Sequence, residues 1–135
     1  MRSDSGPRLL LPSVLVIEDD DATAQSIAEV VREAGFHPVL VATLGEARSV
    51  IAKDRPGAVI LDLTLDSEFG ADLLEELSDA DDSPGVVIVS AFRLAPIVGH
   101  RYGVPVLVKP FAIDALMAAV TTALEKDQRP RRVGQ

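Results

Sequence analysis

The sequence predicts an α/β protein in which a five-stranded parallel sheet is covered by helices on both faces. Five short runs rich in Val, Ile and Leu are apolar without interruption, which is typical of strands buried on both faces. Between these runs, apolar residues recur at the three- and four-residue spacing of helices. Strands that alternate with helices favour a parallel sheet joined by right-handed crossovers, here within one domain of 135 residues.

The first half of the chain predicts three strands and two helices. The first helix turns apolar residues such as Ile27 and Val30 toward the core and ends near Gly35, which suits a helix C-cap. The second helix begins with a capping box, TLGE at 43–46, and is broken by the PG pair at 56–57. The three strands are expected at 14–17, 37–42 and 58–61.

The second half predicts two strands and two clear helices. A short helix is expected at Gly70–Leu77, and a final helix begins near Ala112. The segment 91–103 predicts only a short or irregular helix, because Pro96 and Gly99 both weaken helices. The last two strands are expected at 86–90 and 104–108.

Composition excludes several classes of protein. No apolar run reaches the roughly 18 residues that a membrane helix needs, and the amino-terminal residues lack the apolar core of a signal peptide. The absence of cysteine excludes disulfides and thiolate metal sites. We therefore expect a cytoplasmic protein with a disordered leader at 1–12, a folded domain at 13–126 and a disordered tail at 127–135.

The charge distribution opposes binding to nucleic acid. Residues 14–125 contain 7 Lys and Arg against 19 Asp and Glu, a balance of −12, which repels phosphate backbones and attracts divalent cations or basic protein surfaces. Only ten residues follow Glu125, too few for a helix-turn-helix. We expect output through contact with a protein partner, and no association with nucleic acid or membranes.

Carboxylates follow two of the predicted strands. Glu18 and Asp19 come directly after the first strand, and Asp62 follows the third. In open parallel sheets, ligands bind beyond the carboxyl ends of the strands, where the strand order reverses, so these acids should converge. The next two acids, Asp20 and Asp21, are expected only to stabilise the start of the first helix.

These residue types suit phosphoryl transfer. Three neighbouring carboxylates repel one another unless a cation intervenes, and Mg²⁺ prefers oxygen ligands while keeping waters for phosphate oxygens. Ser90 ends the fourth strand and Lys109 follows the fifth, so a hydroxyl and a compact cation are expected at the same edge. Positioning and charge neutralisation provide most of the catalysis in such sites.

The motifs, in their order, resemble the receiver domains of two-component response regulators. The matching motifs are VLVIEDD at 14–20, VILDL at 59–63, Gly70, VSA at 89–91 and VKPF at 108–111. The resemblance covers about residues 13–126 and implies a flavodoxin-like, doubly wound sheet of strand order 2-1-3-4-5. It also implies that Asp62 accepts a phosphoryl group from a histidine kinase or phosphotransfer protein, without turnover of a separate substrate.

The resemblance assigns a role to each residue of the site. Asp19 and Asp62 would ligate Mg²⁺ directly together with the backbone carbonyl of Thr64, and Glu18 would act largely through water. Ser90 and Lys109 would contact the phosphoryl oxygens. The bond between Lys109 and Pro110 would be cis, an isomer that X-Pro bonds make accessible.

The sequence departs from the family pattern at four places. Asp66 stands where a proline is usual, Phe69 where an aspartate precedes the loop glycine, and Val106 where an aromatic residue is usual. The segment from Ser90 to Lys109 is also about three residues shorter than in the chemotaxis type. We therefore expect a differently shaped loop after Asp62 and an output surface that is not standard.

The resemblance also implies that the residues two positions after the acceptor and after the hydroxyl set the lifetime of the phosphorylated form, and here we expect that form to be long-lived. These positions hold Thr64 and Phe92, and neither is an acid or amide suited to orienting a water molecule. The Phe92 ring could instead shield the phosphoryl group from water.

Two other functions compete with phosphorelay signalling. A non-phosphorylated pseudo-receiver scaffold would explain the altered loop and the missing aromatic residue, but intact Asp62, Ser90 and Lys109 argue against it. A phosphatase of the haloacid dehalogenase type also uses a strand-end aspartate. Such enzymes place that aspartate on the first strand with a second acid two residues later, where this chain has Thr64.

Overall fold

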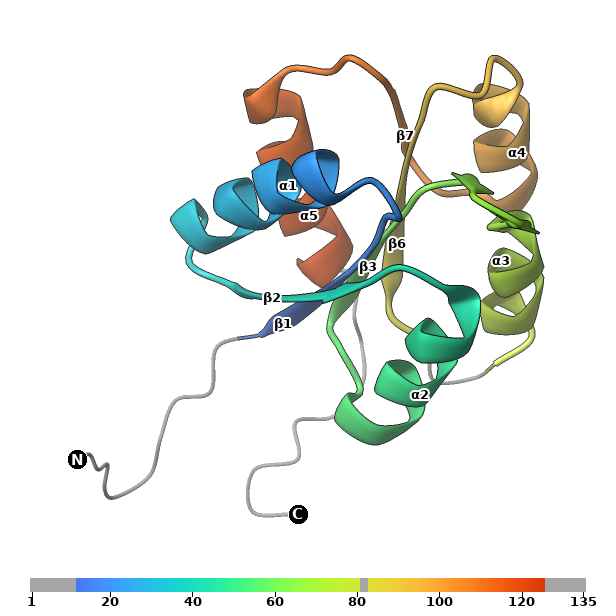
Figure 1. Cartoon of the computed structure of the whole chain (residues 1–135), viewed down its shortest axis with the longest axis horizontal. Coiled ribbons are helices and arrows are strands. Elements are labelled where there is room, and N and C mark those ends of the chain that lie inside the picture. Colours follow the sequence, from blue (N-terminus) through green and yellow to red (C-terminus); the bar gives the residue numbers. More distant parts are fainter. Residues whose placement is uncertain (1–11, 81–82, 126–135) are drawn as a thin grey trace.

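The computed structural model describes residues 12–80 and 83–125, which form a parallel sheet between two helical layers (Figure 1). The five-stranded sheet has the order β2-β1-β3-β6-β7, with every neighbouring pair parallel. Without the separate hairpin strands β4 and β5, this is the predicted order 2-1-3-4-5. The main strands are β1 (Ser13–Ile17), β2 (His37–Val41), β3 (Ala58–Leu61), β6 (Gly85–Ser90) and β7 (Val106–Val108). The helices are α1 (Asp21–Glu33), α2 (Leu44–Asp54), α3 (Ala71–Ser78), α4 (Ala95–Tyr102) and α5 (Ile113–Glu125).

Alternate residues of the central strands contribute side chains to two separate hydrophobic cores, one on each face of the sheet. In β1, Leu15 and Ile17 pack with residues of α2, α3 and α4, whereas Val14 and Val16 pack with α1 and α5. All four side chains have no exposed surface. This burial on both faces explains why the strand reads as an uninterrupted apolar run, as the sequence predicted.

The helix starts follow the predicted capping signals. Asp20 is the N-cap of α1, and its carboxylate accepts a hydrogen bond of 2.9 Å from the Thr23 N–H. Thr43 caps α2 by accepting a hydrogen bond of 3.1 Å from the Glu46 N–H. The Glu46 carboxylate in turn accepts a hydrogen bond from the Ala42 N–H, one residue before the position of an ideal capping box.

Helix α4 confirms the first of the two predicted forms, a short helix, and it is regular. It has 8 residues, and Pro96 lies in its first turn, where a missing N–H costs no intrahelical hydrogen bond. Gly99 is required by packing, since a Cβ there would lie 2.2 Å from Cγ2 of Val106. The two residues that weakened the prediction therefore start the helix and bring it close to β7.

A two-stranded antiparallel hairpin follows β3, and the sequence analysis did not predict it. Its strands are β4 (Thr64–Leu65) and β5 (Glu68–Phe69), joined through Asp66 and Ser67. Leu65 is buried in the core, and the Glu68 carboxylate accepts a hydrogen bond of 3.0 Å from the Leu44 N–H at the start of α2. The hairpin is thereby fixed to the body of the domain.

Several predicted boundaries shift by one or two residues. Strand β2 ends at Val41, and β6 begins at Gly85. Strand β7 begins at Val106 because Pro105 has no N–H, while the Val104 N–H donates to the Gly99 carbonyl. The predicted leader at 1–12 and tail at 127–135 lie outside the described residues, except Pro12, whose carbonyl accepts a hydrogen bond from the His37 N–H.

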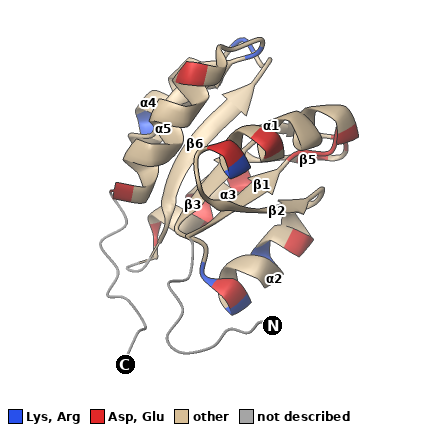
Figure 2. Ribbon diagram, turned by 90° about the vertical axis from the view of Figure 1, so that its left-hand side faces the viewer, with Lys and Arg blue, Asp and Glu red and all other residues tan. Residues whose placement is uncertain are grey.

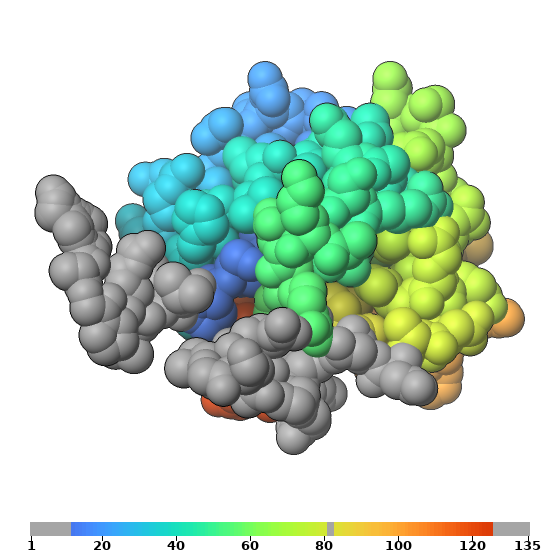
Figure 3. All heavy atoms as spheres, turned by 90° about the horizontal axis from the view of Figure 1, so that it is seen from below, coloured from blue at the N-terminus to red at the C-terminus, as the bar shows by residue number. Residues whose placement is uncertain are grey.

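Asp and Glu residues occur on several helices and loops, with fewer Lys and Arg residues among them (Figure 2). Helices α2 and α3 lie side by side on the face seen in Figure 3. A bidentate ion pair joins them, with Arg48 Nε 2.9 Å from Oε1 and Nη2 2.7 Å from Oε2 of Glu76. Among the described residues, no helix is both long enough and apolar enough to cross a bilayer.

Candidate functional site

Four side chains of the predicted site come from the carboxyl ends of four neighbouring strands. Glu18 and Asp62 directly follow β1 and β3, Ser90 is the last residue of β6, and Lys109 follows β7. The backbone continues the strand ladders for one residue, since the Asp62 N–H donates to Ile17 and the Glu18 N–H donates to Val41. Parallel pairing therefore brings residues that are far apart in sequence to one edge of the sheet.

The predicted acids converge as expected. Carboxylate oxygens of Glu18, Asp19 and Asp62 all lie within 4.8 Å of one another. Glu18 and Asp62 are buried, with 4% and 3% of their surface exposed, and Asp19 is the most exposed of the three. Two carboxylates held in a largely dry position are costly unless cations or hydrogen bonds compensate them.

Burial has a clear effect on Glu18. Desolvation raises the pKa of Glu18, the negative charge of Asp62 raises it further, and the hydrogen bond from Lys109 only partly offsets these two effects. The second carboxylate oxygen accepts a hydrogen bond of 3.2 Å from the Asp20 N–H. The negative charge of the three carboxylates therefore exceeds the positive charge that Lys109 brings to them.

Lys109 is the cation that faces this cluster. Its Nζ lies 2.7 Å from Oε1 of Glu18 and 3.2 Å from Oδ2 of Asp62. Burial lowers the pKa of Lys109, but its hydrogen bond with Glu18 and the charges of both acids outweigh burial and raise that pKa overall. The Lys109–Pro110 peptide bond is cis, as the resemblance implied.

The loop after Asp62 turns back tightly around it. The Thr64 N–H donates to Oδ1 of Asp62 at 3.1 Å, and the Thr64 hydroxyl lies 3.4 Å from the same oxygen. A Cβ at Gly70 would lie 2.6 Å from the Asp62 carbonyl oxygen, so only glycine fits where the hairpin returns. The Gly70 N–H donates to the Leu63 carbonyl at 2.7 Å.

Ser90 lies on β6, the strand next to that of Asp62, and is fully buried. Its hydroxyl accepts a hydrogen bond of 3.1 Å from the Phe92 N–H, and its carbonyl accepts one of 3.0 Å from the Lys109 N–H. Ser90 is thereby held between the loop that follows it and the strand that carries Lys109.

An aromatic contact that the sequence did not predict joins the hairpin after Asp62 to the loop after Ser90. The rings of Phe69 and Phe92 lie 5.6 Å apart between centroids, with an interplanar angle of 85°. Phe69 was recognised only as a departure from the family pattern, and Phe92 only as a possible shield. Their meeting depends on the hairpin, and no local spacing in the sequence signals it.

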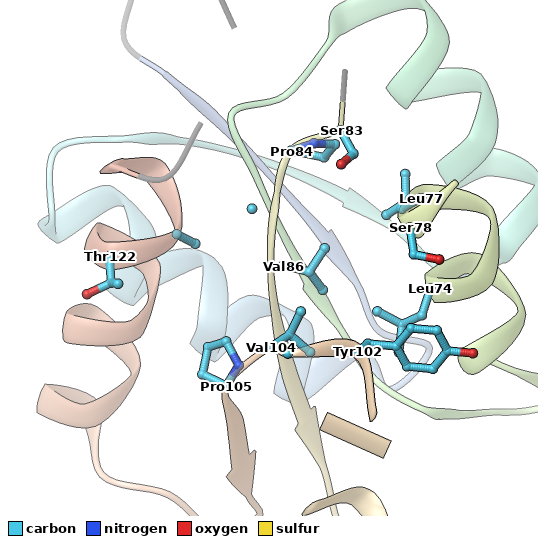
Figure 4. A pocket seen from close by; sticks show the side chains of 13 residues that line it. Leu74, Leu77, Ser78, Ser83, Pro84, Val86, Tyr102, Val104, Pro105 and Thr122 are labelled. Atoms are coloured by element: carbon cyan, nitrogen blue, oxygen red, sulfur yellow. The ribbon is translucent and has the colours of Figure 1, made fainter. Parts of the chain in front are cut away.

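A cavity of about 260 Å³ lies elsewhere (Figure 4). Its lining includes Gly85 and Val86 at the start of β6 and Val104 and Pro105 just before β7, so it lies at the opposite end of these strands from Ser90 and Lys109. Leu74 and Tyr102 border it from α3 and α4 (Figure 4). The acid cluster lies outside it, so this cavity is not the predicted site.

Comparisons with known proteins agree with this arrangement. The response regulator receiver domain family matches residues 14–121. The transcriptional regulatory protein DpiA of Escherichia coli K12 is 34% identical over 114 residues, which are 81% of this chain and 50% of that protein. The C4-dicarboxylate transport transcriptional regulatory protein DctD of Pseudomonas aeruginosa is 33% identical over 120 residues, which are 83% of this chain and 25% of that protein.

A solved structure is similar over nearly its whole length. The receiver domain of the Francisella response regulator 1452 is 29% identical, with a TM-score of 0.76 over 85% of this chain and 98% of that one. This chain spans only a quarter to a half of the length of the two regulatory proteins above. The chain belongs to the response regulator receiver domain family.

Proposed function

We propose that Asp62 accepts a phosphoryl group from a histidine kinase or phosphotransfer protein, and that the phosphorylated domain signals through contact with another protein. One observation carries this proposal: buried Asp62 lies within a cluster of carboxylates and 3.2 Å from the Lys109 ammonium. A carboxylate nucleophile, acidic metal ligands and a cation are the groups that phosphoryl transfer to aspartate needs.

The donor set fits Mg²⁺. All three acidic groups offer hard oxygen ligands within a few ångströms of one another, and the exposed position of Asp19 leaves room for waters. In the proposed site, Asp19, Asp62 and the Thr64 carbonyl are direct ligands, and Glu18 acts through water. Bound Mg²⁺ would offset the repulsion among the acids and neutralise charge on the phosphoryl oxygens.

Asp62, Lys109 and Ser90 would each have a separate role in the phosphoryl transfer. An Asp62 carboxylate oxygen attacks phosphorus, a P–O bond forms, and the P–N bond to the donor histidine breaks as its electron pair returns to the ring. Lys109 gives up its contact with Asp62 and binds a phosphoryl oxygen. The Ser90 hydroxyl can donate to another phosphoryl oxygen while its own oxygen still accepts from Phe92.

The proposed output is a protein contact, and the proposed compartment is the cytoplasm. DpiA and DctD are named as transcriptional regulatory proteins, and each is longer than the region it shares with this chain. The net charge of −8 opposes direct binding of this domain to nucleic acid and favours a partner with a basic surface.

Intact mass after incubation with acetyl phosphate tests the proposal. The parent protein should gain the mass of one phosphoryl group when Mg²⁺ is present and remain unmodified with a chelator. Asp62→Asn should gain none, whereas the matched control Asp66→Asn, in the exposed turn of the hairpin, should behave as the parent. Labelling of Asp62→Asn to the parent's level would refute the assignment, and turnover of a generic phosphate monoester would favour a phosphatase.

A further inference from the structure

The hairpin after Asp62 carries an aromatic residue on the strand that pairs with Thr64. Phe69 pairs directly with Thr64 across the hairpin, and Thr64 donates to Oδ1 of Asp62. Phe69 keeps 41% of its surface exposed, so burial in the core does not account for a large apolar side chain here. It occupies the residue just before Gly70, where the chain returns to pack against the Asp62 carbonyl.

The loop after Ser90 brings the second ring. Phe92 is half-buried and packs against the core on the side of α2, α3 and α4. Its N–H donates to the Ser90 hydroxyl, and its ring meets Phe69 edge to face at 5.6 Å. The aromatic contact is thus the junction between the hairpin and the loop that holds the Ser90 hydroxyl.

The contacts form a closed chain of links that begins and ends at Asp62. On one side, Asp62 is joined through Thr64 to Phe69 and then to Phe92. On the other side, Ser90 is joined through the Lys109 backbone to the Nζ that lies 3.2 Å from Asp62. Two of these links join side chains alone: the Lys109–Asp62 ion pair, whose groups belong to the proposed site, and the Phe69–Phe92 contact. The Phe69–Phe92 contact is therefore the link that a single substitution can open without removing a reacting group.

We propose that the Phe69–Phe92 pair is a clasp that holds the hairpin against the loop after Ser90 and so limits the access of water to phosphorylated Asp62. This inference rests on the proposed function. Hydrolysis needs a water molecule to attack phosphorus opposite the acyl oxygen. The O–P bond then breaks, Asp62 leaves as a carboxylate, and the proton of the water passes to the released phosphate or to solvent. A closed clasp narrows the space in which that water must lie.

The clasp makes Phe69 a positioning residue, since it acts through Phe92 and Thr64 and not on the phosphoryl group itself. Aromatic edge-to-face contacts are weak, so the effect on a rate should be modest. Full loss of such a contact corresponds to a rate change of roughly 2- to 10-fold. Both single Phe→Ala substitutions should give the same change, because either one opens the same contact.

Decay of the phosphorylated protein in Mg²⁺ buffer, followed by intact mass after removal of acetyl phosphate, tests the clasp. Phe69→Ala and Phe92→Ala should each lose the phosphoryl group roughly 2- to 10-fold faster than the parent. The double variant should decay no faster than either single variant. Phe69→Tyr, which keeps the ring, should decay as the parent does.

Leu94→Ala is the matched control, since Leu94 is an exposed apolar residue in the same segment after Ser90 and lies outside the ring contact. It should leave the decay unchanged. Parent-like decay of Phe69→Ala, or multiplied effects in the double variant, would overturn the clasp while leaving Asp62 as acceptor. A parent protein that takes up no phosphoryl group would instead overturn the proposed function and the clasp together.

Discussion

At the scale of single residues, Lys109 compensates two buried carboxylates. Its ammonium contacts both Glu18 and Asp62, and removing one partner of a buried ion pair leaves uncompensated charge in the interior. In the proposed transfer, Lys109 would exchange its contact with Asp62 for one with a phosphoryl oxygen. Its role in the stability of the resting protein can therefore be measured separately from its role in the transfer.

Lys109→Met should destabilise the metal-free protein at neutral pH, by about 3 kcal/mol in the free energy of unfolding. The raised pKa of Glu18 means that the folded state takes up a proton at higher pH than the unfolded chain. The free-energy cost of burying ionised Glu18 without a partner cation therefore disappears as the pH falls through that raised pKa, because Glu18 becomes neutral. Urea unfolding in chelator should show that the free energy of unfolding of Lys109→Met lies below that of the parent, by an amount that decreases toward acidic pH. A difference between the two proteins that does not depend on pH would contradict this account.

Asp19 provides the second test at this scale. Mg²⁺ that binds only the folded state should stabilise the parent by about 3 kcal/mol at roughly 100 times its dissociation constant. Asp19→Ala should lose most of this shift in thermal unfolding, and without metal it should be no less stable, because it relieves repulsion with Glu18 and Asp62. Asp21→Ala, outside the cluster, should keep the shift. An equal shift in Asp19→Ala would place the metal elsewhere.

At the scale of elements, the site depends on close approaches that only glycine permits. Gly70 lets the hairpin return beside Asp62, and Gly99 lets α4 lie against β7, the strand that leads to Lys109. In both places a Cβ would meet backbone or a partly buried side chain at 2.8 Å or less. A glycine whose low propensity argues against a helix is thus the residue that the packing of that helix requires.

Gly99→Ala should therefore destabilise the protein although alanine is the better helix former. The added Cβ would meet Cγ2 of Val106 at 2.2 Å and the Val104 carbonyl at 2.8 Å, and such overpacking costs about 1–3 kcal/mol. Gly45→Ala in α2 is the matched control, since its nearest neighbour would be the Thr43 hydroxyl at 4.0 Å. It should stabilise by about 0.5–1 kcal/mol. Unfolding midpoints of the two variants that shift in the same direction would contradict this packing argument.

At the scale of the whole molecule, the arrangement of the sheet was predictable where the apolar runs in the sequence were continuous. Uninterrupted apolar runs gave the buried strands, and the strand-end acids converged because a parallel sheet aligns its carboxyl ends. The hairpin could not be predicted, because TLDSEF at 64–69 is too short and too polar to mark two strands of two residues each. The sequence left α4 either short or irregular, because the low helix propensity of Gly99 opposes the packing that requires a glycine there.

The central claim is that this sheet edge makes Asp62 the phosphoryl acceptor. Reduction of the phosphorylated protein with borohydride converts an aspartyl phosphate to homoserine, and peptide mass spectrometry then locates the changed residue. The account predicts homoserine at position 62 alone, with Asp19 and Asp66 unchanged, and none when Mg²⁺ has been removed. Homoserine at another position, or a phosphoryl group that resists reduction, would contradict it.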